Sequence, residues 1–383
     1  MIFTDKKDSR LYLEQLKKRY KLSRKLEKKI ILDEFSKTTG HERKYAIKLL
    51  SGWYKHKAGK VHRPHRIYSL NDTLVLVRVC DLLDWINSKR IKPQIGLAID
   101  SLVEAKELTV TREQKEKLVK ISPATIDRLL TRYHKRPVVR GHSYTRAGTL
   151  LKTQIPVRTF ADWSDVKVGF CEIDLVGHDG GLAKGNFSWT LNFVDVVSGW
   201  TEQIAVKSKA QNHVFVGIKT LRERLPFPLL GFDSDSGSEF LNEQLYHYSI
   251  EEKITFTRGR PGKKNDNAFV EEKNDSVIRK WVGYGRYDTE KQLEILNQLY
   301  FFLRFYTNFF LPVMKLTKKT RIGSRIKKIY DMPKTPYQRV LTAEDISKKV
   351  KNKLKEQYKI LNLVRIKKQI DVILGNLKPT SIR

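Results

Sequence analysis

Three acidic residues in the middle of the chain have the types and spacing for divalent-metal chemistry. Asp174 lies in an apolar run, Asp235 follows a second apolar run, and Glu271 lies where a helix should begin. Thirty-five residues separate the last two acids. Carboxylates that converge from such elements can hold two Mg²⁺ ions, the usual machinery for cutting and joining phosphodiesters. The acids therefore indicate a catalytic site for two Mg²⁺ ions, which Mn²⁺ can replace.

Two neighbouring acids compete for the same roles. Asp233 lies two residues before Asp235 and points to the same side of an extended chain, and Glu272 directly follows Glu271. An acid in the first turn of a helix is also a common capping preference. From the residues alone, either member of each pair remains a candidate ligand.

The distribution of charge indicates a polyanionic partner. The chain has 383 residues and a formal net charge of +33. Residues 1–167 have a net charge of +20 and residues 311–383 of +15, whereas residues 168–310, which contain the acids, have −2. Basic flanks around a neutral centre suit a protein whose ends bind nucleic acid while its centre does the chemistry.

Several classes of protein do not fit the sequence. No apolar run approaches the roughly 18 residues of a membrane span, and the first residues lack the pattern of a signal peptide. Cys80 and Cys171 lie far apart in apolar segments, which favours buried free thiols over a disulfide or a zinc site. We therefore expect a soluble, cytoplasmic protein with no membrane partner.

Residues 1–66 predict a helix-turn-helix DNA-binding unit. A helix over 30–37 precedes a Gly-bearing turn at 38–40 and a second helix over 41–50. We expect the second helix to bury Tyr45, Ala46, Leu49 and Leu50. The outward cations expected to contact DNA are Arg43, Lys44 and Lys48. Because any short helical hairpin has the same pattern, a purely structural helix pair is the alternative.

Residues 67–135 predict a second helical unit of helix-turn-helix type. Its last helix begins with Ser122 as the N-cap and Pro123 at the first helical position. That helix ends in a basic segment, in which we expect Arg128 and Arg132 to contact DNA. A purely structural helix fits the same residues equally well. Residues 136–165 have few periodic apolar residues and predict an extended basic linker.

From residue 166 the pattern changes to β-strands. The predicted order β-β-β-α-β-α-β-α is that of the ribonuclease H-like fold. The expected fold class is therefore multidomain. It combines N-terminal all-α helix-turn-helix units, an α/β core over 166–312 with a mixed five-stranded sheet, and a basic, mostly helical region over 313–383. The aromatic run 300–310 is expected to pack in the core rather than to stack on bases.

Two segments of this core resemble those of retroviral integrases and bacterial DDE transposases. Residues 234–240 are similar to their Ser-Asp-x-Gly-x-Glu-Phe segment, and residues 266–271 to their Asp-Asn-Ala-x-x-Glu segment. With Asp174 and the interval of 35 residues, these segments match the D…D-35-E signature. Residues 43–50 and 335–341 are also similar to one branch of insertion-sequence transposases. The His/Cys zinc unit of the integrases is absent from the sequence.

The resemblance implies roles for particular residues. It implies that Asp174, Asp235 and Glu271 are the catalytic metal ligands, rather than Asp233 and Glu272. The Gly/Pro-rich loop 257–265 would hold the DNA strand at the scissile phosphate, although a flexible surface loop is the alternative. The cations of that loop are Arg258, Arg260, Lys263 and Lys264. Many relatives follow the Glu with an aromatic pair and a Lys, and this chain departs from them there.

The resemblance further implies the transposase of a bacterial insertion sequence. Such an enzyme binds the terminal repeats of its element on double-stranded DNA, nicks the ends to expose 3′-hydroxyls, and joins them to target DNA by transesterification. Paired ends imply a homo-multimer on DNA in a cytoplasmic, nucleoid-associated protein. The alternatives are a catalytically inactive, domesticated helix-turn-helix regulator and a structure-selective nuclease of ribonuclease H-like fold.

Overall fold

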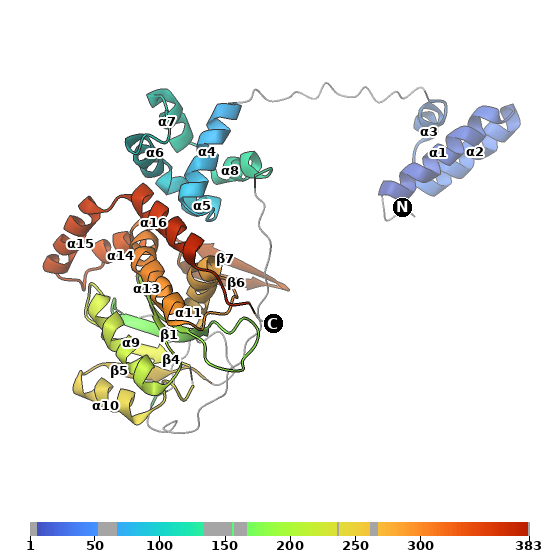
Figure 1. The fold of residues 1–383 in the computed structure, drawn as a ribbon. Helices are drawn as coiled ribbons and strands as arrows, with labels where there is room; N and C mark the ends of the chain where they lie inside the picture. Colours follow the sequence, from blue (N-terminus) through green and yellow to red (C-terminus); the bar gives the residue numbers. More distant parts are fainter. Residues whose placement is uncertain are drawn as a thin grey trace. The chain divides into compact units, whose positions relative to one another are not determined.

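The computed structural model describes residues 6–52, 67–133, 155–156, 167–235, 237–260 and 267–381. The chain forms two compact units, Met1–Ile67 and Tyr68–Arg383 (Figure 1). The second unit contains the sheet together with the helices before and after it. The linker predicted at 136–165 lies almost entirely outside the described residues. The finer division into five segments stays a prediction.

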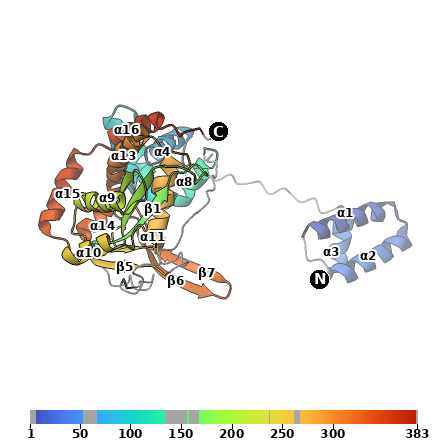
Figure 2. The ribbon, with the colours of Figure 1, turned by 60° about the horizontal axis from the view of Figure 1, so that its bottom comes forward.

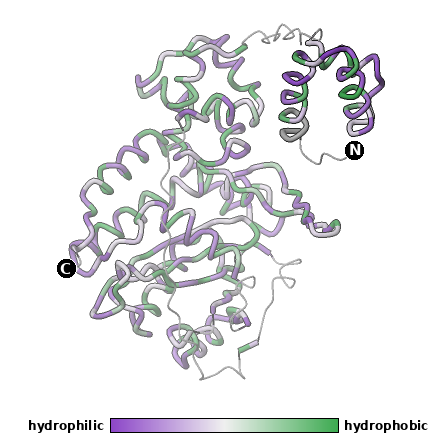
Figure 3. Tube along the Cα trace, turned by 90° about the vertical axis from the view of Figure 1, so that its right-hand side faces the viewer, coloured by the Kyte–Doolittle hydropathy of each residue, from purple (hydrophilic) through white to green (hydrophobic). Residues whose placement is uncertain are grey.

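In the described part of the N-terminal unit, three helices pack around a small apolar core. They are α1 (Lys6–Leu22), α2 (Lys25–Thr39) and α3 (Arg43–Leu50). Polar and apolar stretches follow one another along these helices (Figure 3). Such a repeat is typical of helices with one buried side. The core residues are Leu16, Ile31, Leu32, Phe35, Ala46 and Leu50.

The turn between α2 and α3 has the predicted length of three residues but lies two residues later, at 40–42. Residues 38 and 39 still belong to α2, which ends at Gly40 with a left-handed φ of +74°. The predicted burial of Tyr45 is wrong, because its side chain is 39% exposed. Its ring lies edge-on to His41 at 4.9 Å on the surface of the unit. The side of α3 that faces the core carries Ala46 and Leu50, and Tyr45 lies outside it.

Short helices precede the sheet in the second unit. They are α4 (Leu70–Leu82), α5 (Ser88–Ile91), η1 (Lys92–Gln94), α6 (Ile95–Glu104), α7 (Arg112–Val119) and α8 (Pro123–Leu130). As predicted, Ser122 caps α8 and Pro123 is its first residue. These helices share one apolar core with the rest of the unit. The Tyr306 hydroxyl, for example, donates to the carbonyl of Leu82 at 2.8 Å.

The centre of the second unit is a mixed five-stranded sheet, as predicted. Its strands are β1 (Phe170–Gly177), β2 (Trp189–Asp195), β3 (Thr201–Val206), β4 (Gly231–Ser234) and β5 (Thr255–Arg258). The spatial order is β3-β2-β1-β4-β5. β1, β2 and β3 run antiparallel, whereas β1, β4 and β5 run parallel. This order and the helices between the later strands give the predicted ribonuclease H-like fold class.

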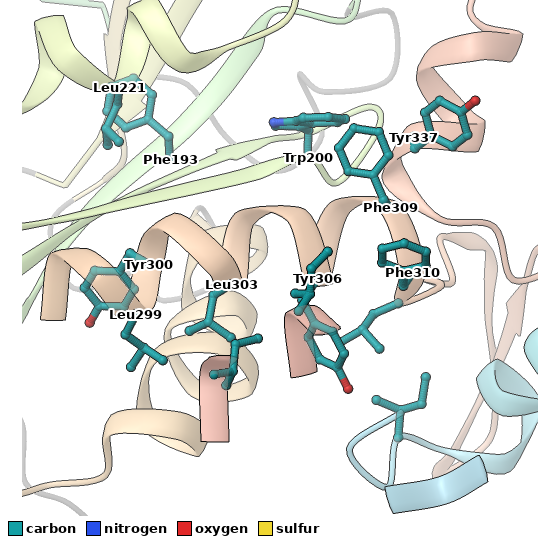
Figure 4. Packing of buried hydrophobic residues seen from close by; sticks show 14 of the residues in the cluster. Phe193, Trp200, Leu221, Leu299, Tyr300, Leu303, Tyr306, Phe309, Phe310 and Tyr337 are labelled. Carbon is teal, nitrogen blue, oxygen red and sulfur yellow. The ribbon is translucent and has the colours of Figure 1, made fainter. Parts of the chain in front are cut away.

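The two faces of the sheet differ in chemistry because side chains alternate along each strand. On β1, Ile173 points to an apolar face that also carries Phe193 of β2, which is paired with it. Helix α9 (Gln211–Arg224) packs against β2 and β3, and its Leu221 lies close to Phe193 in Figure 4. The other face carries Glu172, Asp174 and a row of polar residues. The sequence thus delivers the acids to one side of the sheet.

The polar face is covered by the helices that follow β5. They are α11 (Ala268–Lys273), the π-helical turn η4 (Asn274–Arg279), α12 (Lys280–Val282) and α13 (Glu290–Phe305). Of these, α11 packs on β1 and β2 and α13 packs on β3. Helix α10 (Glu243–Glu251) precedes β5 and packs against it. A second π-helical turn, η5 (Tyr306–Phe310), ends α13. Its aromatic rings pack beside Trp200 and Tyr337 (Figure 4), so the prediction of core packing is confirmed for this run except Phe301, which is 49% exposed.

The region after the core is mostly helical, as predicted, but it begins with a hairpin that we did not predict. The helices are α14 (Pro336–Thr342), α15 (Lys348–Ile360) and α16 (Leu363–Asn376). The hairpin strands are β6 (Leu316–Ile322) and β7 (Arg325–Tyr330). A two-residue connection, Gly323-Ser324, joins them, and Gly323 has a φ of +58°. A two-residue connection that begins with Gly is a hairpin signal that the sequence did contain.

Candidate active site

Asp174 lies in the middle of β1, one residue beyond the stretch that pairs with β4, on the polar face of the sheet. Its side chain is partly buried and accepts two hydrogen bonds. The backbone N–H of Leu175 donates to Oδ1 at 2.8 Å, and the Asn274 side chain donates to Oδ2 at 2.6 Å. Two donors fix the carboxylate in one orientation, which a metal ligand requires.

Asp235 directly follows β4, the strand next to β1. The register pairs Ile173 with Ser234, so Asp235 leaves the sheet beside Asp174. The backbone N–H of Gly237 donates to its Oδ1 at 2.9 Å. Burial raises the pKa of Asp235, while this hydrogen bond and the positive charge of Lys209 lower it. Asp235 is therefore an oriented carboxylate at the end of a strand.

Glu271 lies in the first turns of α11, and its residue is exposed. The neighbouring Glu272 has a different environment, since it forms an ion pair of 3.2 Å with Lys273. The charges of Lys273 and Arg90 also act on Glu272, whereas the charge of Glu271 acts on Asp174. Of these two neighbouring acids, Glu271 is the one whose charge reaches the acids of the sheet.

The electrostatics of Asp174 join the three acids. Burial and then the negative charge of Asp235 raise the pKa of Asp174 to about 7, and Glu271 adds to the increase. The hydrogen bonds from Leu175 and Asn274 oppose it. Like charges raise a carboxyl pKa only when they lie close together. Asp174 is thus the centre of an acidic cluster to which Asp235 and Glu271 contribute.

The cluster matches Mg²⁺ in donor chemistry but is not a closed metal site. Carboxylate oxygens are the ligands that Mg²⁺ prefers, and a cation would relieve the repulsion that raises the pKa of Asp174. Within the described ranges, no three Asp, Glu, His or Cys side chains lie close enough together to hold a metal ion. The three carboxylates would have to draw closer around an ion.

The competing Asp233 lies deeper in the sheet than Asp235. It is fully buried and accepts a hydrogen bond of 2.5 Å from the Thr257 hydroxyl on β5. Asp233 is paired across the parallel strands with Glu172, which is also fully buried. Glu172 accepts a hydrogen bond of 2.8 Å from the backbone N–H of Val270 at the start of α11. Asp233 and Glu172 therefore bond to the elements around the outer acids, Asp233 to β5 and Glu172 to α11.

Burial perturbs the inner pair as well. It raises the pKa of Glu172 to about 8, although the hydrogen bond from Val270 opposes the increase. The charge of Asp233 adds to it. Glu172 has a clear structural role, because its carboxyl accepts from a backbone N–H that no turn of α11 can satisfy. It therefore ties α11, and with it Glu271, to β1.

A chain of buried amides behind Asp174 was missed by sequence reasoning. Asn192 on β2, which is paired with Asp174, donates to Oδ1 of Asn274 at 2.8 Å. The Oδ1 of Asn192 in turn accepts from Gln203 at 3.0 Å and from Thr201 at 3.2 Å. The available signal was polar residues at alternate positions of predicted buried strands, where an amide needs a partner.

Lys209 is a further residue that the sequence did not single out. It lies in the connection between β3 and α9, and its side chain is exposed. Burial raises the pKa of both Asp235 and Glu239, and the charge of Lys209 opposes that increase. A cation at the edge of an acidic site can bind the phosphate on which the site acts. Only its position after a strand, between Ser208 and Ala210, could have drawn notice.

The predicted DNA contacts of the core lie beside the acids in part. Arg258 ends β5 and Arg260 is exposed, while Lys263 and Lys264 lie outside the described residues. The N–H of Gly259 donates to the carbonyl of Ser234 at 2.9 Å, immediately before Asp235. The loop that carries these cations therefore starts next to the acidic cluster.

The predicted DNA contacts of the helices lie on surfaces. In the N-terminal unit Arg43, Lys44 and Lys48 are exposed, and Arg43 forms an ion pair with Asp33 of α2. In the second unit Arg128 and Arg132 are exposed, and Arg128 donates to the Thr125 hydroxyl at 2.8 Å. None of these cations is drawn into an apolar core.

One curated protein is similar to this chain over most of its length. No family model matches it. The uncharacterized protein y4rM of Sinorhizobium fredii is 37% identical over 330 residues, which are 85% of this chain and 93% of that protein. No helix in the described ranges has the length and apolar character needed to cross a bilayer.

Two solved structures are similar at low identity. The catalytic core domain of BIV integrase is 18% identical, with a TM-score of 0.31, and covers 45% of this chain and 92% of that chain. The HTLV-2 integrase catalytic core domain in complex with magnesium is 14% identical, with a TM-score of 0.30. The match covers 39% of this chain and 92% of the integrase chain. The fold assignment rests on the sheet order alone.

Proposed function

We propose that this chain, which belongs to the same family as y4rM of Sinorhizobium fredii, is a DDE-type DNA transposase of an insertion sequence. It would bind the terminal repeats of its element, cleave to expose 3′-hydroxyls, and join them to target DNA. One observation carries the proposal. Asp174 has a pKa of about 7 because Asp235 and Glu271 add their charges to its burial. Carboxylates gathered from adjacent strands and a helix at one face of a sheet are suited to phosphodiester chemistry.

Asp174, Asp235 and Glu271 would hold the metal ions in this proposal. Two Mg²⁺ ions, which Mn²⁺ can replace, would supply Lewis-acid stabilisation of charge on the phosphate and lower the pKa of the attacking oxygen. Hydrogen bonds from Leu175 and Asn274 would keep the carboxylate of Asp174 oriented, and the N–H of Gly237 would do so for Asp235.

Cations around the acids would position the DNA strand. Lys209 lies near Asp235 on one side, and Arg258 and Arg260 begin the loop on the other. They would bind the phosphates that flank the scissile bond, because charged donors form strong hydrogen bonds to phosphate oxygens. Lys263 and Lys264 would extend the same contact.

The helices would supply the binding to transposon ends. In the N-terminal unit, α3 would lie in a major groove as the recognition helix, with Arg43, Lys44 and Lys48 toward the DNA. Arg128 and Arg132 of the second unit would contact a neighbouring stretch of backbone. Since two ends must be cut together, we propose a homo-multimer on double-stranded DNA, associated with the nucleoid in a bacterial cytoplasm.

The test replaces each acid by its amide. With DNA that carries the inverted repeats flanking the reading frame, Asp235→Asn and Glu271→Gln should bind as tightly as the unchanged protein. Their Mg²⁺-dependent cleavage and strand transfer should fall about 10³-fold or more, because the ligand charge is lost while the shape is kept. Gel-shift and cleavage assays measure the two properties separately.

Glu272→Gln is the matched control, since it removes a neighbouring acid that pairs with Lys273. It should keep cleavage within about threefold of the unchanged protein. Retained cleavage in Asp235→Asn would refute the site. End binding without cleavage by the unchanged protein would instead support a domesticated regulator, and cleavage without preference for the repeats would support a structure-selective nuclease.

A further inference from the structure

The hairpin of β6 and β7 stands out from the surface of the second unit. Figure 2 shows the two strands extending beyond the helices and the sheet. Every residue of β7 is exposed, and so is every residue of β6 except Thr320. Among the exposed side chains are Ile322, Ile326 and Ile329, at 64%, 52% and 43%. An isolated two-stranded hairpin has little stability of its own, so this one needs an anchor.

The base of the hairpin is anchored by Asp331. Its carboxylate accepts from the backbone N–H of Lys315 at 2.7 Å and from two nitrogens of Arg339 at 2.7 and 3.0 Å. The backbone of Val313 pairs with that of Lys334 immediately below. The stem is therefore held against α14, which carries Arg339, while the strands beyond it contact little else.

The hairpin is basic on both of its faces. Residues 316–330 contain six Lys and Arg and no Asp or Glu. Cross-strand pairing assigns Lys318, Lys327 and Arg325 to one face. It assigns Lys319, Lys328 and Arg321 to the other. Lys319 is paired directly with Lys328, and like charges in such a pair destabilise a sheet. A polyanion bound around the hairpin would remove that repulsion.

We propose that this hairpin is an arm that inserts into a groove of duplex DNA and contacts the backbone without reading sequence. The inference rests on the proposed function, which makes duplex DNA the substrate. A ribbon lying flat on DNA would need cations on one face only. A ribbon within a groove has phosphates along both walls, and the major groove is wide enough for two strands. Four of the six cations are Lys, which bind phosphate as point charges.

A second explanation of the lysines makes a different prediction. Lys on exposed edge strands prevents pairing with strands of other molecules. If that were their whole role, neutral variants would aggregate and would keep their affinity for DNA. Size-exclusion chromatography of each variant therefore accompanies every binding measurement.

The test is the affinity of the full chain for a random-sequence duplex in EDTA, as a function of salt. The variant Lys318→Gln/Lys319→Gln/Lys327→Gln/Lys328→Gln should bind about 10- to 100-fold more weakly near 0.1 M salt. Its slope of log affinity against log salt should be smaller by about 3, since each phosphate contact contributes roughly 0.9. The matched control replaces Lys348, Lys349, Lys353 and Lys355 of α15 by Gln. It removes the same charge and should lose less than about threefold.

Two double variants separate a groove from a flat surface. Lys318→Gln/Lys327→Gln and Lys319→Gln/Lys328→Gln neutralise opposite faces, and each should lose a comparable share of affinity. The inference is overturned if one face alone matters, if the α15 control loses as much as the hairpin variant, or if single-stranded DNA of equal length shows the same loss. Because binding is measured without metal, these outcomes are independent of catalysis. Metal-dependent cleavage by the unchanged protein tests the proposed function separately.

Discussion

Asp174 is the residue through which the acidic cluster can be measured. Its pKa of about 7 is well above the value of about 3.9 in an unfolded chain, because of burial and the charges of Asp235 and Glu271. The folded protein therefore binds a proton here that the unfolded chain has released between pH 4 and pH 7. The resulting stability is fully present below pH 4 and is lost as the pH rises through 7.

We predict that Asp174→Asn removes this pH dependence in metal-free protein. Relative to the variant, the unchanged protein should lose about 1–3 kcal/mol of stability between pH 4.5 and pH 8. Thermal unfolding in EDTA at several pH values measures the difference. Mg²⁺ at pH 8 should raise the melting temperature of the unchanged protein more than that of the variant. Parallel stability curves for the two proteins would contradict the acidic cluster.

The sequence could suggest the three acids as candidate ligands but not the groups that hydrogen-bond to them. Asp174, Asp235 and Glu271 were recognisable because their spacing is defined along the chain. Asn274 and Asn192 were not, because their bonds join β2 to the turn after α11, 82 residues away. A polar side chain in a strand pattern does not reveal its partner until the strands and helices have packed.

At the scale of elements, the start of α11 is tied to the sheet by a buried acidic side chain of β1. Glu172 accepts from the N–H of Val270, which lies in the first turn of the helix that carries Glu271. The helical run of α11, η4 and α12 depends on such a contact at its start, because the first N–H groups of a helix have no acceptor within it. Val270 itself is fully buried and adds apolar packing.

We predict opposite outcomes for two replacements of Glu172. Glu172→Gln keeps an oxygen acceptor and removes a buried acid, so its melting temperature should equal or exceed that of the unchanged protein. Glu172→Ala leaves a buried N–H without its acceptor and should cost about 1–3 kcal/mol. The alanine variant should also lower metal-dependent cleavage at least tenfold, since α11 is released. Equal melting temperatures and cleavage rates for the two variants would exclude this positioning role.

Most elements could be predicted because their patterns are local. The strands of the core are apolar runs bounded by turns, and Ser122-Pro123 marks the start of α8. The hairpin of β6 and β7 was missed because almost none of its residues is buried, so no apolar face identified its strands. The π-helical turns were missed for another reason, since hydrophobic periodicity does not distinguish them from ordinary helix.

In the whole molecule, the boundary of the basic N-terminal region does not coincide with the boundary between the two compact units. The first compact unit ends at Ile67, whereas the basic N-terminal region continues to residue 167. The helices α4–α8 share the apolar core of the sheet and belong to the second unit. Folding of the second unit should therefore not require the first.

We predict that a chain of residues 68–383 folds and keeps the chemistry without the end recognition. Its main unfolding transition should lie within a few degrees of that of the full chain. Mg²⁺-dependent cleavage of random duplex DNA should persist, while the preference for terminal repeats should fall about 10²- to 10³-fold. Calorimetry and competition binding measure the two effects. Retained preference for the repeats would assign recognition to the second unit.

The buried amides on the polar face of the sheet predict how the sequences of relatives should differ. If the proposed function is right, a copy released from selection for catalysis can exchange Asn192 and its partner Gln203 together for apolar residues of similar volume, because replacing both partners of a buried hydrogen bond is often neutral or stabilising. Relatives without selection for catalysis should therefore acquire apolar residues at these two positions before they lose the acids. If the proposed function is right, amides retained at both positions would mark relatives that are still selected for catalysis.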